Sequence, residues 1–150
     1  MRLEIFRTLW GYRGSWQQAL DEALGAGFDG LEARIPETAA QRAINARLLR
    51  EQNVPYIATL FTSTPVLPRQ SDSPQVHLED LRIKLDWAAE LSPRLVNVLP
   101  GNDRWSLSEQ VDFFARAVEL AAACGLKVCF EIHRGRSLYS PWVTLDVIRQ

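Results

Sequence analysis

Apolar and polar residues alternate along one segment of the sequence, Val128-Cys129-Phe130-Glu131-Ile132-His133-Arg134-Gly135-Arg136. Because successive side chains of a strand point to opposite faces of a sheet, this pattern predicts a β-strand over residues 127–133. Helices must cover its apolar face, which leaves Cys129, Glu131 and His133 together on the opposite face. A carboxylate and an imidazole are therefore expected near each other at the carboxyl end of this strand.

Two other segments divide their side chains in the same way. Residues 28–35 place Glu32 and Arg34 on one face and apolar side chains on the other, and Asn97 interrupts the apolar run 95–99. An open parallel sheet with helices on both faces would not carry polar side chains along one face of three strands. A (β/α) barrel does carry them, because its active site lies at the carboxyl ends of its strands. The alternation thus favours a barrel.

Strand and helix patterns alternate along the whole chain. The expected strands cover residues 3–10, 28–35, 54–62, 95–99 and 127–133, and the expected helices cover 15–26, 36–52, 74–91, 106–125 and 141–150. Pro36 and Pro141 suit the first turns of their helices. Ser106 and Glu109 form a capping box at the start of the fourth helix. Five strand–helix units in series predict an α/β fold with a parallel sheet.

Two architectures accommodate five such units. A doubly wound open sheet of the flavodoxin type is complete at about five strands, whereas an eight-unit barrel typically needs about 250 residues. The sequence holds no G-x-G-x-x-G or G-x-x-x-x-G-K-[ST] motif, and its last helix has no C-cap glycine. We therefore predict one domain over residues 1–150 with strand order 1-2-3-4-5. It would be the first five of the eight units of a TIM barrel, truncated after the start of helix 5.

The composition limits the classes of function. The chain has 150 residues, of which 47% are hydrophobic, and a formal net charge of −1. This length can bury a core, and the near-zero charge gives no electrostatic basis for binding nucleic acid or an acidic membrane. The sequence contains no uninterrupted apolar run of the roughly 18 to 20 residues that cross a membrane. Cys124 and Cys129 are too few for a disulfide framework, so a cytoplasmic location is expected.

The end of the last predicted strand combines three kinds of chemistry. Glu131 and His133 share a face roughly 7 Å apart along the strand axis. Arg134 and Arg136 follow in a loop that contains a glycine. Together these groups offer a metal ligand or base, a proton shuttle and a clamp for an anion or hydroxyl. A buried ion pair of Glu131 with one of the arginines is the structural alternative.

Two segments resemble the xylose isomerase-like TIM-barrel superfamily, which includes sugar phosphate isomerases and epimerases. They are Gly27-Phe28-Asp29-Gly30-Leu31-Glu32 and Phe130-Glu131-Ile132-His133-Arg134-Gly135-Arg136. The resemblance covers the whole chain but only five of the eight units of the family. The endonuclease branch of this superfamily binds several zinc ions through several histidines. Because this chain has only His77 and His133, that branch is set aside, and His77 is expected at the surface.

The resemblance implies a single divalent metal at the barrel mouth, with Glu131 as one ligand and the other three from strands beyond Gln150. It implies a carbohydrate isomerase or epimerase in which two carboxylates move the proton, namely Glu131 and one that this chain lacks. His133, which shares a face with Glu131, is the second catalytic candidate. A proton would move between adjacent carbons of a small sugar through a cis-enediolate. Oxygen ligands suit Mg²⁺ or Mn²⁺ best, with Co²⁺ or Zn²⁺ also possible. The chain alone would then be inactive, and its exposed strand edges would invite self-association.

Five residues are candidates for contact with the substrate: Glu32, Asn97, Trp105, Arg134 and Arg136. Pairing of Glu32 with Arg34, and packing of Trp105 against the loops, are the structural alternatives. Trp10 and Trp16 are expected to pack in the core and against a helix. Two rival functions stay open at this point: a complete five-stranded binding or regulatory module of the flavodoxin type, and a metal-free barrel that works as a lyase or binds a ligand.

Overall fold

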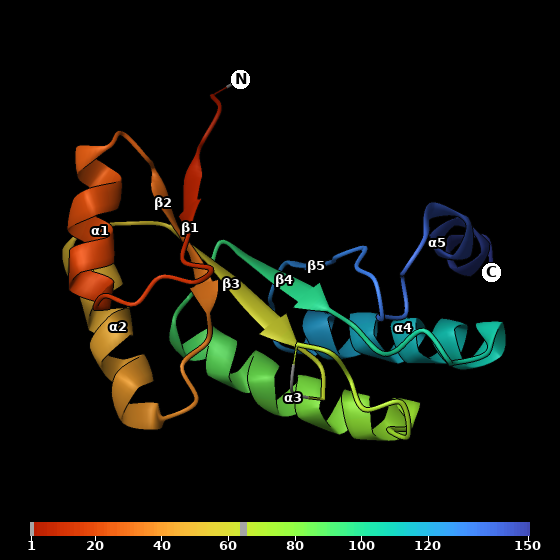
Figure 1. The fold of residues 1–150 in the computed structure, drawn as a ribbon. Coiled ribbons are helices and arrows are strands. Elements are labelled where there is room, and N and C mark those ends of the chain that lie inside the picture. Colours follow the sequence, from red (N-terminus) through yellow and green to blue (C-terminus); the bar gives the residue numbers. More distant parts are fainter. Residues whose placement is uncertain (1, 64–65) are drawn as a thin grey trace.

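Five parallel strands form one sheet in the order β1-β2-β3-β4-β5, as the sequence predicted (Figure 1). The computed structural model describes residues 2–63 and 66–150. Strands and helices alternate strictly: β1 (Phe6–Thr8), α1 (Trp16–Gly25), β2 (Gly30–Arg34), α2 (Ala39–Glu51), β3 (Tyr56–Phe61), α3 (Pro74–Glu90), β4 (Leu95–Leu99), α4 (Leu107–Ala123), β5 (Val128–Phe130) and α5 (Pro141–Ile148). None of the helices in the described ranges combines the length and apolarity that crossing a membrane requires.

The register of the strands aligns their polar side chains. Arg34 pairs with Thr59, Thr59 pairs with Asn97, and Asn97 pairs with Cys129. Paired residues of neighbouring strands lie on the same face, so these four side chains form a row across the sheet. The opposite face carries the buried apolar side chains of the strands: Leu31, Ala33, Tyr56, Ala58, Leu60, Val96 and Val98.

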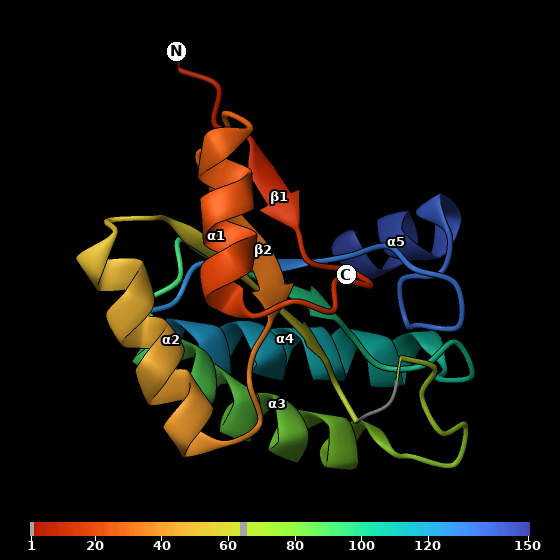
Figure 2. The ribbon, with the colours of Figure 1, turned by 60° about the vertical axis from the view of Figure 1, so that its left-hand side comes forward.

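Helices cover only the apolar face of the sheet. Figures 1 and 2 show α1 to α4 wrapped around one side of the twisted strands. Residues of α1, α3 and α4 join the strand residues in one hydrophobic core, for example Leu20, Leu85 and Phe113. A doubly wound sheet would have helices on both faces. The fold is thus a partial barrel, whose inner face carries the polar row.

Several elements are shorter than the sequence predicted. β5 ends at Phe130 rather than at His133, although the Glu131 N–H still donates to the Val98 carbonyl (2.8 Å). Ile132, expected on the apolar face, lies past the end of the pairing and is 50% exposed. Pro36 does not begin a helix: α2 is capped by Thr38, because the Thr38 hydroxyl accepts from the Gln41 N–H (3.3 Å).

The capping box predicted at the fourth helix is confirmed. The Ser106 N–H donates to Glu109 Oε2 (2.8 Å), and the Glu109 N–H donates to Ser106 Oγ (3.3 Å). These bonds satisfy amide groups that a helix N-terminus otherwise leaves unpaired. The start of α4 is therefore set by two side chains that are close in sequence, which explains why the local pattern sufficed to predict it.

Burial along α3 predicts which substitutions destabilise the fold. Leu85 is fully buried in the core, whereas Ile83 on the same helix is exposed. For the protein made from its complete reading frame, we expect Leu85→Ala to lower the free energy of unfolding by about 2–5 kcal/mol. Ile83→Ala should change it by less than about 0.5 kcal/mol. Urea denaturation followed by circular dichroism measures both, and equal losses would contradict the assignment of the faces.

Candidate functional site

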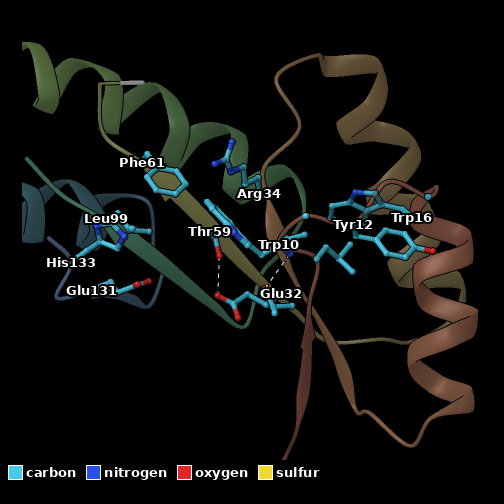
Figure 3. A pocket seen from close by; sticks show the side chains of 15 residues that line it. Trp10, Tyr12, Trp16, Glu32, Arg34, Thr59, Phe61, Leu99, Glu131 and His133 are labelled. Carbon is cyan, nitrogen blue, oxygen red and sulfur yellow. Dashed lines mark hydrogen bonds between the residues drawn. The ribbon is translucent and has the colours of Figure 1, made fainter. Parts of the chain in front are cut away.

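A cavity of about 710 Å³ lies at the carboxyl ends of the strands (Figure 3). The ends of β1, β2 and β3 and the segment after β5 all contribute to its wall. Its polar lining includes Glu32, Arg34, Thr59, Glu131 and His133, and its aromatic lining includes Trp10, Tyr12, Trp16 and Phe61. The cavity thus unites the two candidate catalytic residues with one candidate substrate residue, Glu32.

Asn97 holds the carboxylate of Glu131. The Asn97 Nδ2 group donates to Glu131 Oε2 (2.7 Å), and Asn97 Oδ1 lies 3.5 Å from the Sγ of Cys129. Glu131 makes no ion pair within the described ranges, so the predicted alternative of an ion pair with Arg134 or Arg136 is not what the structure shows. The second oxygen of Glu131 has no partner among those residues and can bind a ligand.

The backbone defines the protonation of His133. Its Nδ1 lies 2.7 Å from the Arg134 carbonyl oxygen, which can only accept a hydrogen bond. Nδ1 therefore carries the proton, and Nε2 has a free lone pair when the ring is neutral. This arrangement suits a base or a metal ligand, since metal-binding histidines commonly donate their second N–H to a carbonyl.

Glu32 and Arg34 do not pair with each other. Glu32 Oε1 accepts from the Thr59 hydroxyl (3.1 Å), and Arg34 packs over the rings of Trp10 and Phe61. Burial raises the pKa of the Cys129 thiol, and the carboxylates of Glu131 and Glu32 raise it further. The carboxylates of Glu32 and Glu131 therefore both lie close enough to affect the thiol of Cys129. Because its pKa is raised, this thiol stays protonated and unreactive.

Comparison with known proteins identifies the fold. No family model and no curated protein matches the sequence. A fusion protein of a xylose isomerase-like TIM barrel and 4-hydroxyphenylpyruvate dioxygenase matches 99% of the chain, with a TM-score of 0.77 and 19% identity over 25% of the fusion. The chain has the fold of part of a xylose isomerase-like TIM barrel. Its five units correspond to the N-terminal part of such a barrel.

Two further structures share this TIM-barrel fold. A D-allulose 3-epimerase from Methylomonas sp. in complex with D-allulose matches 99% of the chain, with a TM-score of 0.73 and 20% identity. A structure of the IOLI protein with a bound zinc atom matches 98% of the chain, with a TM-score of 0.69 and 12% identity. The chain spans 58% of the length of each. At these identities the likeness establishes the fold alone.

Four of the five residues predicted to contact the substrate are absent from the lining of the cavity: Asn97, Trp105, Arg134 and Arg136. Arg136 is fully buried beneath it and donates to the carbonyl oxygens of Thr62 (2.8 Å), Gly101 (3.3 Å) and Val66 (2.7 Å). Burial lowers the pKa of its guanidinium to about 10. Arg136 itself follows β5, and the carbonyl oxygens that it binds belong to the segments after β3 and β4. It therefore links all three segments.

Two tryptophans lie where the sequence did not place them: Trp105, a candidate for substrate contact, is buried, and Trp10, expected in the core, lines the cavity. Trp105 is buried, packs against His77 and Phe113, and donates its indole N–H to the Asp72 carbonyl (3.2 Å). Trp10, expected in the core, is 63% exposed and lines the cavity. It lies two residues after the end of β1, and that position near a strand end was the signal available in the sequence.

The other two candidates for substrate contact, Asn97 and Arg134, lie outside the cavity lining. Asn97 lies behind the cavity wall and acts through Glu131, whereas Arg134 is exposed and outside the lining. Thr59 and Tyr12, which the sequence did not single out, line the cavity. Among the described residues no group of three or more His, Cys, Asp or Glu side chains is arranged to hold a metal ion.

His77 is buried, and its predicted place at the surface is wrong. The inner face of α3 turns it toward the sheet, where Nδ1 lies 2.7 Å from the Thr62 hydroxyl. Its ring packs edge-on against Trp105. Burial, assisted by the charge of Arg136, lowers the pKa of His77 from 6.5 to about 4. The helix pattern did not reveal this, because the loop and Trp105 that cover His77 are distant in sequence.

The buried imidazole predicts a pH dependence of stability. Since the pKa of His77 is lower in the folded protein, the unfolded chain binds the proton more tightly. The stabilisation is fully present above pH 6.5 and is lost as the pH falls toward 4. Between pH 8 and pH 5 we expect the wild-type protein to lose about 2 kcal/mol more unfolding free energy than His77→Gln. Urea titrations at both pH values measure this, and parallel losses would contradict it.

Proposed function

We propose that the chain contributes the N-terminal part of a divalent-metal-dependent sugar or sugar phosphate isomerase or epimerase. The reaction would transfer a proton between adjacent carbons through a cis-enediolate. One observation carries the proposal: the carboxylate of Glu131, held by Asn97, lies in one cavity with His133. The fold supports it, because a structure of this fold contains D-allulose. The substrate is accordingly proposed to be a small carbohydrate.

The side chains present fit a divalent metal in part. Glu131 keeps one oxygen without a protein partner in the described ranges, and this oxygen is the proposed ligand. Its other oxygen is oriented by Asn97, as supporting hydrogen bonds orient metal-binding carboxylates. An oxygen ligand favours Mg²⁺ or Mn²⁺. The zinc atom in the IOLI structure adds Zn²⁺ to the ions worth testing, together with Co²⁺.

The metal would supply Lewis acidity that polarises the carbonyl and hydroxyl oxygens of the sugar. The protein supplies the positions of the groups around it. We assign the acceptance and return of the proton to the carboxylate of Glu131 as a whole, while Nε2 of His133 can accept a proton from a sugar hydroxyl. Glu32, oriented by Thr59, can accept a hydrogen bond from a further hydroxyl. Trp10 and Tyr12 offer ring faces that pack against the sugar and exclude water.

Removal of the Glu131 carboxylate should abolish proton transfer. With the complete protein, Mn²⁺ and D-allulose or its 6-phosphate in D₂O, we expect deuterium to enter the sugar at the carbon that loses its proton. Glu131→Gln should slow this exchange by about 10²–10⁴-fold, since general-base catalysis accounts for factors of that size. Glu119→Gln changes the same charge on an exposed position of α4 and should leave the rate unchanged. Nuclear magnetic resonance follows the exchange.

Metal binding provides a second readout of the same proposal. Mn²⁺ should raise the melting temperature of the wild-type protein and of Glu119→Gln, because a ligand that binds only the folded state stabilises it. The increase should be smaller for Glu131→Gln. Deuterium exchange that survives treatment with a chelator would favour a metal-free barrel instead. Equal exchange in wild-type protein and Glu131→Gln would refute the role of this carboxylate.

A further inference from the structure

Arg34 lines the cavity from the carboxyl end of β2. Its guanidinium carbon lies 4.9 Å from the ring centroid of Trp10 and 4.7 Å from that of Phe61 (Figure 3). The two ring centroids are only 6.1 Å apart, so both rings lie toward the same side of the guanidinium. The Arg34 side chain is exposed, and it is held in place by stacking rather than by an ion pair.

The other arginines that stack on rings have acceptors for their N–H groups. Arg7 stacks on Tyr12 and pairs with Glu22 (2.8 Å). The ring partner of Arg42 is Trp87, and its carboxylate partner is Glu90 (2.8 Å). Arg136 stacks on Phe61 and donates to backbone carbonyls. The guanidinium of Arg34, by contrast, has no hydrogen-bond or ion-pair partner in residues 2–63 and 66–150.

The carboxylate of Glu32, two residues before Arg34 on β2, does not pair with the guanidinium of Arg34. Glu32 lies on the same face of the strand and accepts from Thr59 instead of from Arg34. A guanidinium presents five donors in a planar fork that matches the oxygens of a phosphate or a carboxylate. Stacking reduces the freedom that the side chain loses when it binds such a group. The open donors therefore form a preorganised position for an oxyanion on the cavity wall.

We propose that Arg34 binds an oxyanion of the substrate, so that the site takes a phosphorylated sugar or a sugar acid rather than a neutral sugar. The inference rests on the proposed function and narrows its substrate class. It also moves the anion clamp away from the position that the sequence suggested. Arg136 cannot reach the cavity because it is buried among backbone carbonyls, whereas Arg34 lines it.

The test compares ligands that differ in charge. Calorimetry with the complete protein and Mn²⁺ would measure dissociation constants for D-allulose, D-allulose 6-phosphate and D-gluconate. We expect at least one anionic ligand to bind about tenfold more tightly than D-allulose. Arg34→Gln should weaken that ligand by about 10- to 100-fold and change D-allulose by less than about twofold. Arg34→Lys keeps the charge without the fork and should fall between the two.

Arg104→Gln is the matched control, since it removes the same charge from an exposed position outside the cavity lining and should leave all three affinities unchanged. The anionic ligand whose affinity falls most in Arg34→Gln shows whether the oxyanion bound by Arg34 is a phosphate or a carboxylate. Equal binding of neutral and anionic ligands, no binding of either anionic ligand, or equal losses for all ligands in Arg34→Gln would overturn the inference.

Deuterium exchange separates this inference from the proposed function. In one outcome, deuterium enters both D-allulose and its phosphate at rates that Arg34→Gln does not change. That result would support the isomerase or epimerase and overturn the oxyanion site. Binding of an anion that depends on Arg34, with no exchange in any of the three ligands, would support the oxyanion site and overturn the reaction. The two proposals therefore fail in different measurements.

Discussion

The parallel register of the sheet is the constraint on which the site depends. It places Arg34, Thr59 and Asn97 at one level on β2, β3 and β4. Since α1 to α4 cover the apolar face, these polar side chains have to face the interior. The bonds from Asn97 to Glu131 and from Thr59 to Glu32 both require that register. If the pairing of a strand shifted by one residue, its polar side chains would point toward the helices instead of toward the interior. The cavity would then lose those side chains from its wall.

A second constraint acts below the cavity, at the buried guanidinium of Arg136. Burial of this charge is tolerable because carbonyl oxygens from the segments after β3 and β4 surround it. The turn that carries it is closed by hydrogen bonds from the His133 N–H to Leu138 (3.0 Å) and from the Arg136 N–H to His133 (3.1 Å). The position of His133 on the cavity wall therefore depends on an arginine that never reaches the cavity.

Local patterns in the sequence anticipated much of this arrangement. The alternation in β2 and β5 identified the faces of the strands correctly, and the capping box at Ser106 identified the start of α4. Glu131 and His133 line one cavity as expected, although His133 lies past the end of β5. These predictions succeeded because each rests on residues that are close in the chain, where backbone geometry alone decides the direction of a side chain.

Predictions that depended on loops were less successful. His77 and Trp105 are buried together, and Trp10 is exposed, because the segments that cover or uncover them are distant in sequence. Sequence periodicity reports which face of an element is apolar, and it thereby favoured the strand order 1-2-3-4-5, which the structure confirms. It carries no information on which segment packs over a given side chain. Only long-range packing could distinguish Arg136, whose N–H groups donate to backbone carbonyls, from Arg34, which lines the cavity and has no hydrogen-bond or ion-pair partner among the described residues.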